Sequence, residues 1–242
     1  MYAILTALEA ESDCFIEKTS RKFIHKWNSY KFIIGTFAGQ ECIIGHTGMG
    51  KVQAAVAVSH IIENFKPSIV FYTGIAGSLN SDLNIGDVVI AQDSMQWDID
   101  ITLFGFKPGE LPEANLSLDK KSDSKIIKFY KTDSKLLKKS EQWIPGGYKV
   151  KQGRIITGDS FFNPTLDQEK KSAVEKINAD AVDMEGAAAG AACRMNKVSF
   201  FLARVISDTP DGRRPKSFKK FLKKSSAKMA ELVDFLISCD FS

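Results

Sequence analysis

The sequence predicts an α/β protein built around a mixed β-sheet. Short runs rich in β-branched and aromatic residues alternate with stretches whose apolar residues recur every three or four positions. The 242-residue chain is 44% hydrophobic and 26% charged, which suits one large globular domain with room for a sizeable core. No internal repeat or low-complexity linker interrupts it. We therefore expect strands and helices to alternate within a single domain.

Seven segments have the composition of strands, and they lie at residues 2–8, 31–37, 41–47, 68–77, 87–93, 151–158 and 198–208. Between several of these segments the apolar period changes to that of a helix. One helix is expected over about 50–65. Its common apolar face, with Ser59 filling the gap, is predicted to pack in the core and consists of Val52, Ala55, Val56, Ile62 and Phe65.

Two further helices are predicted in the second half of the chain. Glycine and proline punctuate residues 94–150, which indicates a long functional loop with a Lys-rich helix near 119–140. The C-terminal segment shows the clearest amphipathic pattern. With Ser225 allowed between them, the residues on its apolar face are Phe218, Phe221, Leu222, Met229, Leu232, Val233 and Leu236.

The charge balance indicates no global attraction to nucleic acid, because the formal net charge is only +4. A local basic surface on the C-terminal helix would suit a polyanion such as heparin, although charged residues normally occupy a solvated helix face. It comprises Arg213, Arg214, Lys216, Lys219, Lys220, Lys223, Lys224 and Lys228. The N-terminus has no basic region typical of a secretion signal, and no apolar run approaches membrane-spanning length. We expect a cytoplasmic protein with no membrane partner.

Neither a metal nor another cofactor is expected. The four cysteines, Cys14, Cys42, Cys193 and Cys239, form no C-x-x-C pair, and the three histidines share no ligand spacing with them. A structural zinc site and a disulfide framework are therefore both disfavoured.

The stretch GHTGMGKV at 45–52 fits the glycine and lysine spacing of a phosphate-binding loop. Val52, however, stands where a Ser or Thr should bind magnesium, which argues against phosphoryl transfer. A glycine turn that starts a helix or lets backbone approach a ligand is the better interpretation. No G-x-S-x-G motif or histidine beside a nucleophile indicates a catalytic triad.

Acidic residues occur in three apolar settings. Glu11 follows the first strand, Asp183 and Glu185 flank Met184, and Asp208 ends a strand. Each alone would be better explained as a helix cap or a salt bridge. Together, near the ends of strands, they indicate a cleft that works with carboxylates. Such pairs suit glycosyl transfer to water, where one acid protonates the leaving group and another carboxylate activates water.

Ordered motifs along nearly the whole chain carry a more specific signal. They are ALEAE (7–11), TGMGKVQAA (47–55), TGIAGSL (73–79), NIGDVV (84–89), DIDITLFGFKPGELP (98–112), TGDSFF (157–162), VDMEGAA (182–188) and RVISD (204–208). Through them the chain resembles the 5′-methylthioadenosine/S-adenosylhomocysteine nucleosidases of the nucleoside phosphorylase superfamily. The resemblance implies a three-layer sandwich over residues 1–242, with a twisted mixed sheet flanked by helices. It also implies hydrolysis of the adenine–ribose bond in 5′-thio-substituted adenosines, as in methionine salvage.

The resemblance also implies roles for individual residues. Asp208 would be the general acid at adenine N7, and Glu11 would deprotonate the attacking water. Glu185 would bind the ribose hydroxyls, with Met184 nearby and Arg204 fixing the water site, whereas Asp183 is expected to be structural. The further substrate-binding residues that it implies are Phe161, Phe162, Ala76 and Gly77 around the base and sugar, and Met49, Ile101, Phe104, Phe106, Pro112 and Phe218 around the 5′ substituent. Residues 101–112 would reach the neighbouring site of a homodimer.

Water is favoured over phosphate as the acceptor. The superfamily's phosphorylases carry a Gly-Asp-Pro-x-Arg-like loop near the first strand, whereas this chain has ALEAE there, and a carboxylate repels phosphate. The chain departs from the family pattern at Ile75 and Ser78, which puts one polar contact near the ribose or water in question. A futalosine hydrolase or another purine nucleosidase, sharing the acids but not the 5′ pocket, is the nearest alternative.

Overall fold

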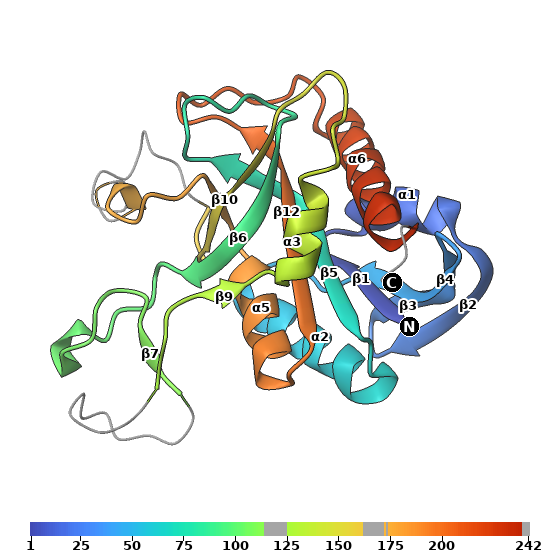
Figure 1. The fold of residues 1–242 in the computed structure, drawn as a ribbon, viewed down its shortest axis with the longest axis horizontal. Helices are drawn as coiled ribbons and strands as arrows, with labels where there is room; N and C mark the ends of the chain where they lie inside the picture. The colour runs from blue at the N-terminus through green and yellow to red at the C-terminus, as the bar shows by residue number, and fades with distance from the viewer. Residues whose placement is uncertain (114–124, 162–171, 173, 239–242) are drawn as a thin grey trace.

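A mixed β-sheet lies between two layers of helices in the computed structural model, which describes residues 1–113, 125–161, 172 and 174–238 (Figure 1). This confirms the predicted three-layer α/β architecture. No helix within the described ranges is long and apolar enough to cross a membrane.

The strands and helices have the following bounds: β1 Tyr2–Thr6, α1 Glu9–Lys18, β2 Ser20–Trp27, β3 Tyr30–Phe37, β4 Gln40–His46, α2 Lys51–Phe65, β5 Ile69–Ser78, β6 Val88–Gln96, η1 Thr102–Phe104, β7 Leu111–Pro112, β8 Ile126–Ile127, β9 Tyr130–Lys131, α3 Ser134–Ser140, β10 Val150–Thr157, β11 Ala181–Asp183, α5 Gly186–Met195, β12 Ser199–Asp208 and α6 Phe218–Ser238. All the predicted strand segments correspond to strands, namely β1, β3, β4, β5, β6, β10 and β12. Helix α1 and the edge strand β2 were not anticipated, because few apolar residues mark them.

Within the described residues the main sheet has ten strands, in the order β11-β10-β6-β12-β5-β1-β4-β3-β2, with β9 paired to β6. The central strands β4, β1, β5 and β12 run parallel. Strands β2, β3 and β4 form an antiparallel edge. Because β1, β5 and β12 point the same way, their carboxyl ends meet at one edge of the sheet, where open α/β sheets bind ligands.

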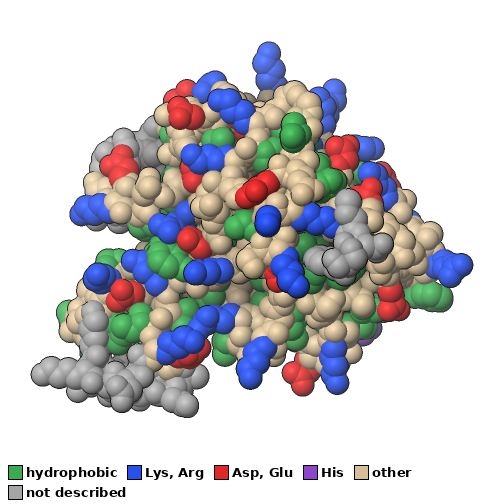
Figure 2. Space-filling view, in the orientation of Figure 1, with side chains coloured by type: hydrophobic (Ala, Val, Ile, Leu, Met, Phe, Trp, Pro, Cys, Tyr) green, Lys and Arg blue, Asp and Glu red, His purple; other side chains and the backbone are tan. Residues whose placement is uncertain are grey.

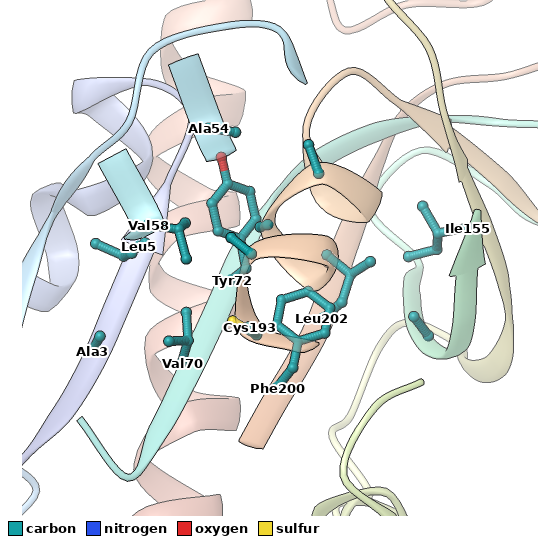
Figure 3. Close-up of a cluster of buried hydrophobic side chains, with 14 of the residues drawn as sticks. Ala3, Leu5, Ala54, Val58, Val70, Tyr72, Ile155, Cys193, Phe200 and Leu202 are labelled. Atoms are coloured by element: carbon teal, nitrogen blue, oxygen red, sulfur yellow. The ribbon is translucent and has the colours of Figure 1, made fainter. Parts of the chain in front are cut away.

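Each face of the sheet is covered by its own set of helices. Helices α2 and α5 pack over one face, and Figure 3 shows Tyr72 of β5 pointing toward Ala54 in this layer. Helices α1, α3 and α6 pack over the other face around Phe15, Leu136 and Met229. Removing these apolar side chains from water is the main source of stability for both layers.

The predicted buried face of α2 was right in part. Ile62 is buried as predicted, and Ala55 and Phe65 are partly buried against the core. Val52 and Val56, however, are 73% and 53% exposed, and the helix also buries Ala54, Ala57, Val58 and Ile61. Alanines face inward because α2 packs against the alanine-rich helix α5, and small side chains allow close approach. The larger valines are thereby turned outward.

The Lys-rich helix predicted near 119–140 was also wrong in extent. Helix α3 spans only Ser134–Ser140. Asp133 is its N-cap, and the Asp133 carboxylate accepts hydrogen bonds from two α3 amides. The β-branched and aromatic residues just before it form β8 and β9 instead. Residues 114–124 lie outside the described residues. The C-terminal helix α6 buries the predicted face except at Phe221, which is partly buried, and Phe218, which is half exposed.

Candidate active site

A pocket of about 240 Å³ lies where the carboxyl ends of β1, β5, β11 and β12 meet. It contains most of the predicted site residues, namely Glu11, Met49, Ala76, Gly77, Phe161, Met184, Glu185, Asp208 and Phe218. These residues come from distant parts of the sequence. The acidic segments singled out in the sequence thus share one cavity.

Glu11 is buried at the start of α1, with 3% of its surface exposed. Its Oε2 accepts hydrogen bonds from the amides of Ala7 (3.1 Å) and Leu8 (2.8 Å), and its Oε1 accepts one from Ile75 (2.9 Å). Burial raises the pKa of Glu11, although the Arg204 charge and the three amides oppose the shift. The residue therefore caps α1 and also faces the cavity.

Gly74 allows Glu11 and Arg204 to come this close to β5. A Cβ at this position would lie 2.7 Å from Glu11 Oε1 and 2.6 Å from Arg204 Nη1, so any side chain would displace one of them. Gly74 was not among the predicted site residues, although it belongs to the TGIAG motif.

Arg204 does not line the pocket but lies behind it, fully buried. Its Nε donates a 2.8 Å hydrogen bond to Asp183 Oδ2, and Nη2 forms an ion-pair contact of 2.7 Å with the same oxygen at an angle unsuited to a second hydrogen bond. Asp183 Oδ1 accepts hydrogen bonds from Thr157 Oγ1 (2.5 Å) and from the Gly186 amide (3.2 Å). Asp183 thus holds the guanidinium and caps α5, which agrees with its expected structural role.

Glu185 faces the pocket and contacts the same guanidinium less closely, at 3.8 Å. Its Oε1 accepts a 2.9 Å hydrogen bond from the Gly50 amide in the turn before α2. Burial and the neighbouring Asp183 charge raise the pKa of Glu185 from its ordinary value of 4.5 to about 7, against the lowering effects of Arg204 and Gly50. The surroundings of Glu185 therefore oppose its ionisation.

Asp208 reaches the pocket through a bulge at the end of β12. The pairing with β5 shifts register between Ile206 and Asp208, which leaves Ser207 as the extra residue. The Ser207 hydroxyl donates a 2.6 Å hydrogen bond to Asp208 Oδ1. A Cβ at Gly77 would lie 2.9 Å from Asp208 Oδ2, so glycine is needed there for this approach.

Apolar side chains form the open part of the pocket. Met49, Phe161 and Phe218 are 60%, 65% and 50% exposed, and the Arg214 guanidinium lies 5.2 Å from the Phe161 ring centre. Predicted residues outside this pocket are Ile101, Phe104, Phe106 and Pro112, on the segment around η1 and β7 that extends away from the sheet (Figure 1). Phe106 is buried within that segment, whereas Phe104 is half exposed. Phe162 lies outside the described residues.

Several residues lining the pocket were missed. They are Ala7, Leu8, Ile75, Ser160, Val182 and Ser207. Ser207 is the clearest omission, since a hydroxyl next to the proposed acid is a recognisable signal. Ile75 donates its backbone amide to Glu11, and a backbone amide is present whatever the side chain is. The isoleucine, which departs from the family pattern, therefore keeps this hydrogen bond. Ser78 instead bonds Asn80 within a turn.

The glycine turn at 45–52 starts α2, and Lys51 lies 2.7 Å from Asp98. Within the described part of the chain, no group of three or more His, Cys, Asp or Glu side chains is arranged to hold a metal ion. Cys14, Cys42 and Cys193 are free thiols, and Cys239 lies outside the described residues.

Comparison with known proteins gives consistent results. The sequence profile of the Phosphorylase superfamily matches residues 1–238. A 5′-methylthioadenosine/S-adenosylhomocysteine nucleosidase of Staphylococcus haemolyticus is 32% identical, over 98% of this chain and 99% of the relative. The Neisseria meningitidis enzyme of that name, solved with methylthio-immucillin-A, has a TM-score of 0.84 at 28% identity, with 98% of each chain covered.

A futalosine hydrolase of Helicobacter pylori is also similar, with a TM-score of 0.82 at 28% identity, covering 98% of this chain and 96% of that one. It shares the fold and most of the chain length. The full-length profile match and the identity to the Staphylococcus relative nevertheless show the family. The chain belongs to the phosphorylase superfamily and, within it, to the 5′-methylthioadenosine/S-adenosylhomocysteine nucleosidases.

Proposed function

We propose that this protein hydrolyses the N-glycosidic bond between adenine and ribose in 5′-methylthioadenosine and S-adenosylhomocysteine, and also in 5′-deoxyadenosine. The products are adenine and, from the first two substrates, a 5-thioribose. One observation carries the proposal: Glu11, Glu185 and Asp208 line a single pocket whose open part is apolar. Carboxylates at the closed end suit sugar and water, and Met49 and Phe218 suit a 5′-alkylthio group.

Asp208 supplies the proton for the leaving group. As the C1′–N9 bond breaks, its electron pair passes into the adenine ring, and a proton moves from Asp208 to N7. Adenine is a poor leaving group as an anion, and a positioned acid accelerates such a step typically by about 10²–10⁴-fold. The hydrogen bond from Ser207 to Oδ1 orients the carboxyl group toward the base.

Glu11 activates the water that attacks C1′. Burial makes its carboxylate a stronger base than a free glutamate, since the charged form is poorly solvated. It accepts a proton from the water as the C1′–O bond forms on the oxocarbenium-like sugar. Glu185 accepts hydrogen bonds from the ribose 2′ and 3′ hydroxyls, while Arg204 keeps a positive charge beside both glutamates.

Hydrolysis is favoured over phosphorolysis on electrostatic grounds. The pocket wall carries the carboxylates of Glu11, Asp183, Glu185 and Asp208, and Arg204 behind them is paired with Asp183. A phosphate entering this cavity would meet more negative than positive charge. A water molecule carries no such penalty.

A homodimer would complete the apolar end of the pocket. Leu103 and Phe104, in the segment extending from the sheet, are 95% and 51% exposed, and Val52 and Val56 on α2 are also exposed. Large apolar side chains exposed side by side in the sequence, as at Leu103 and Phe104, suit an interaction site. We propose that residues 101–112 of one subunit, including Ile101, Phe104 and Pro112, line the neighbouring subunit's pocket.

The experiment that tests the proposal measures adenine release with and without phosphate. Its substrates are methylthioadenosine, adenosylhomocysteine, 5′-deoxyadenosine and futalosine. Phosphate-independent release from the first two supports the proposal. A requirement for phosphate would make the enzyme a phosphorylase, and turnover of futalosine alone would favour the second candidate, which the Helicobacter pylori likeness supports.

A polyanion-binding function rests on the basic residues of α6 and the loop before it. Lys219, Lys220, Lys223 and Lys224 are exposed, whereas Lys228 donates a hydrogen bond to the Gly86 carbonyl and is not free for a ligand. On the face seen in Figure 2, basic and acidic side chains are interspersed, as on an ordinary solvated surface. Salt-sensitive heparin retention that is lost on Lys-to-Glu changes would establish this function. Cytoplasmic location and a role in methionine salvage stay predictions from the sequence.

A further inference from the structure

Lys51 links three segments next to the pocket, although neither Lys51 nor the two aspartates that it contacts line it. Its Nζ lies 2.7 Å from Asp98 Oδ1 and 3.6 Å from Asp159 Oδ2. Its backbone amide donates a 2.9 Å hydrogen bond to Asp159 Oδ1, and the Asp159 amide donates one of 2.9 Å to Asp98 Oδ2. Lys51, Asp98 and Asp159 therefore form a closed ring of contacts, which we call the lysine clasp.

Each member of the lysine clasp is next to a part of the candidate site. Lys51 follows Gly50, whose amide donates to Glu185, and Met49 of the apolar wall. Asp159 precedes Ser160 and Phe161, which line the pocket. Asp98 precedes the segment 101–112, which is proposed to reach the neighbouring subunit. The lysine clasp thus connects the turn before α2, the pocket wall at Ser160 and Phe161, and the start of the segment 101–112.

We propose that Lys51 is a positioning residue, which acts through the lysine clasp to keep the Gly50 amide on Glu185 and the Phe161 wall in place. This inference rests on the proposed nucleosidase function. Lys51 touches no atom of the substrate in this scheme. It helps to set the position of the turn before α2, where Gly48 and Gly50, both with positive φ, lie on either side of Met49.

The charges explain why Lys51 matters more than a surface lysine. Its side chain is 15% exposed and that of Asp98 is 24% exposed, so solvent screens the pair only in part. Removing the ammonium would leave Asp98 and Asp159 close together with no cation between them. The repulsion between the two carboxylates would push the segment after β6 away from the segment after β10. It would also pull Asp159 away from the Lys51 amide, the first amide of α2.

A shift of the turn would be visible in the titration of Glu185. The Gly50 hydrogen bond lowers the pKa of Glu185, so its loss would raise that pKa further. The other charged and titratable groups facing Glu185 are Asp183, Arg204, Glu11 and Tyr72, and all of them remain in a Lys51 variant. If ribose binding needs ionised Glu185, the acid limb of kcat/KM moves to higher pH.

The test compares Lys51→Met with Lys51→Arg in the full-length protein, and uses Lys22→Met on the distant edge strand β2 as the matched control. We expect Lys51→Met to raise KM for methylthioadenosine by about tenfold or more and to shift the acid limb upward, as misplacement near a reacting group does. Lys51→Arg should keep KM and the acid limb close to those of wild type, and Lys22→Met should change neither KM nor the acid limb. An unchanged KM and pH profile in Lys51→Met, with only a lower Tm, would overturn the proposal.

Two further measurements keep the result decisive. If Lys51→Met does not fold, Asp98→Asn is assayed in the same way, since it weakens the clasp while keeping the lysine. If the wild-type protein releases no adenine, the proposed function has failed, and the clasp is then judged by calorimetric titration with adenine. Binding to Lys51→Met weakened by about tenfold would support the clasp, and equal binding would refute it.

Discussion

Arg204 and Asp183 form an ion pair with Nη2 2.7 Å from Oδ2, and each side chain is only 1% exposed. Glu185, two residues from Asp183, contacts the same guanidinium at 3.8 Å and faces the pocket. The two acids of the VDMEG motif therefore differ in their surroundings. One neutralises a buried cation, and the other is available to a ligand.

Asp183→Asn should mainly reduce stability. The substitution leaves the Arg204 charge buried without its close partner, and breaking a buried pair from one side costs about 3–5 kcal/mol. Urea unfolding at neutral pH measures the loss, with the exposed Asp82→Asn as the matched control. An unfolding free energy equal to that of wild type would show that the pair is not important for the fold.

Glu185→Gln should lower turnover of methylthioadenosine much more than Asp183→Asn does, because a neutral amide is a poorer acceptor for two ribose hydroxyls. Steady-state kinetics on both variants decide between the acids. Equal effects on kcat/KM would mean that the assignment of one acid to the ribose and the other to the fold is wrong.

Glu185→Gln should also change how stability depends on pH. The folded-state pKa of Glu185 is about 7 against an ordinary value of 4.5, so wild type loses stability as pH rises between these values, and the loss is complete above pH 7. Glutamine does not titrate. The Tm of the variant relative to wild type should therefore be higher at pH 8 than at pH 4.5, as scanning fluorimetry can measure. A difference in Tm between the variant and wild type that does not change with pH would contradict the raised pKa of Glu185.

Asp208→Asn should abolish adenine release while the fold and inhibitor binding remain measurable. Loss of a general acid removes about 10²–10⁴-fold or more of the rate. Ser207→Ala is a milder variant, because it removes only the hydrogen bond to Oδ1. Single-turnover assays and titration with a nucleoside analogue separate chemistry from binding. Near-normal turnover by Asp208→Asn would rule out its role as the acid.

Glu11→Gln should lower both kcat and Tm. All three amides around Glu11 are donors, and an amide side chain must turn its NH₂ group toward at least one of them. The variant also lacks the carboxylate that we propose accepts the proton from water. Rates at saturating substrate and thermal unfolding measure the two effects. A variant with wild-type kcat would place the base elsewhere.

Substituting both Leu103→Asp and Phe104→Asp should give a monomer with weakened substrate binding. Charges at these exposed apolar positions oppose the burial that a dimer interface requires. Light scattering and KM for methylthioadenosine test the prediction, with Ile144→Asp, at another exposed apolar residue, as control. Dimers that persist with unchanged KM would exclude this segment from the interface.

Much of the fold followed from local patterns. Every predicted strand was found, because short runs of β-branched and aromatic residues between turn-forming residues favour strands that pack in a sheet. The apolar pattern of α6 was sufficient to identify its buried face. The face of α2 was not, because Ala54 and Ala57 became core residues only through packing against α5, a partner that periodicity does not reveal.

The sequence by itself determined the acidic segments, the glycine turn before α2 and the family resemblance, since these depend on residue types and their order. Only the tertiary structure decided that the acids share one cavity, that Asp183 holds Arg204, and that Gly50 donates to Glu185. These contacts join residues separated by as many as 135 positions, as in the Gly50–Glu185 bond. Sheet order and the bulge at Ser207 bring them together, and neither is encoded in a local pattern.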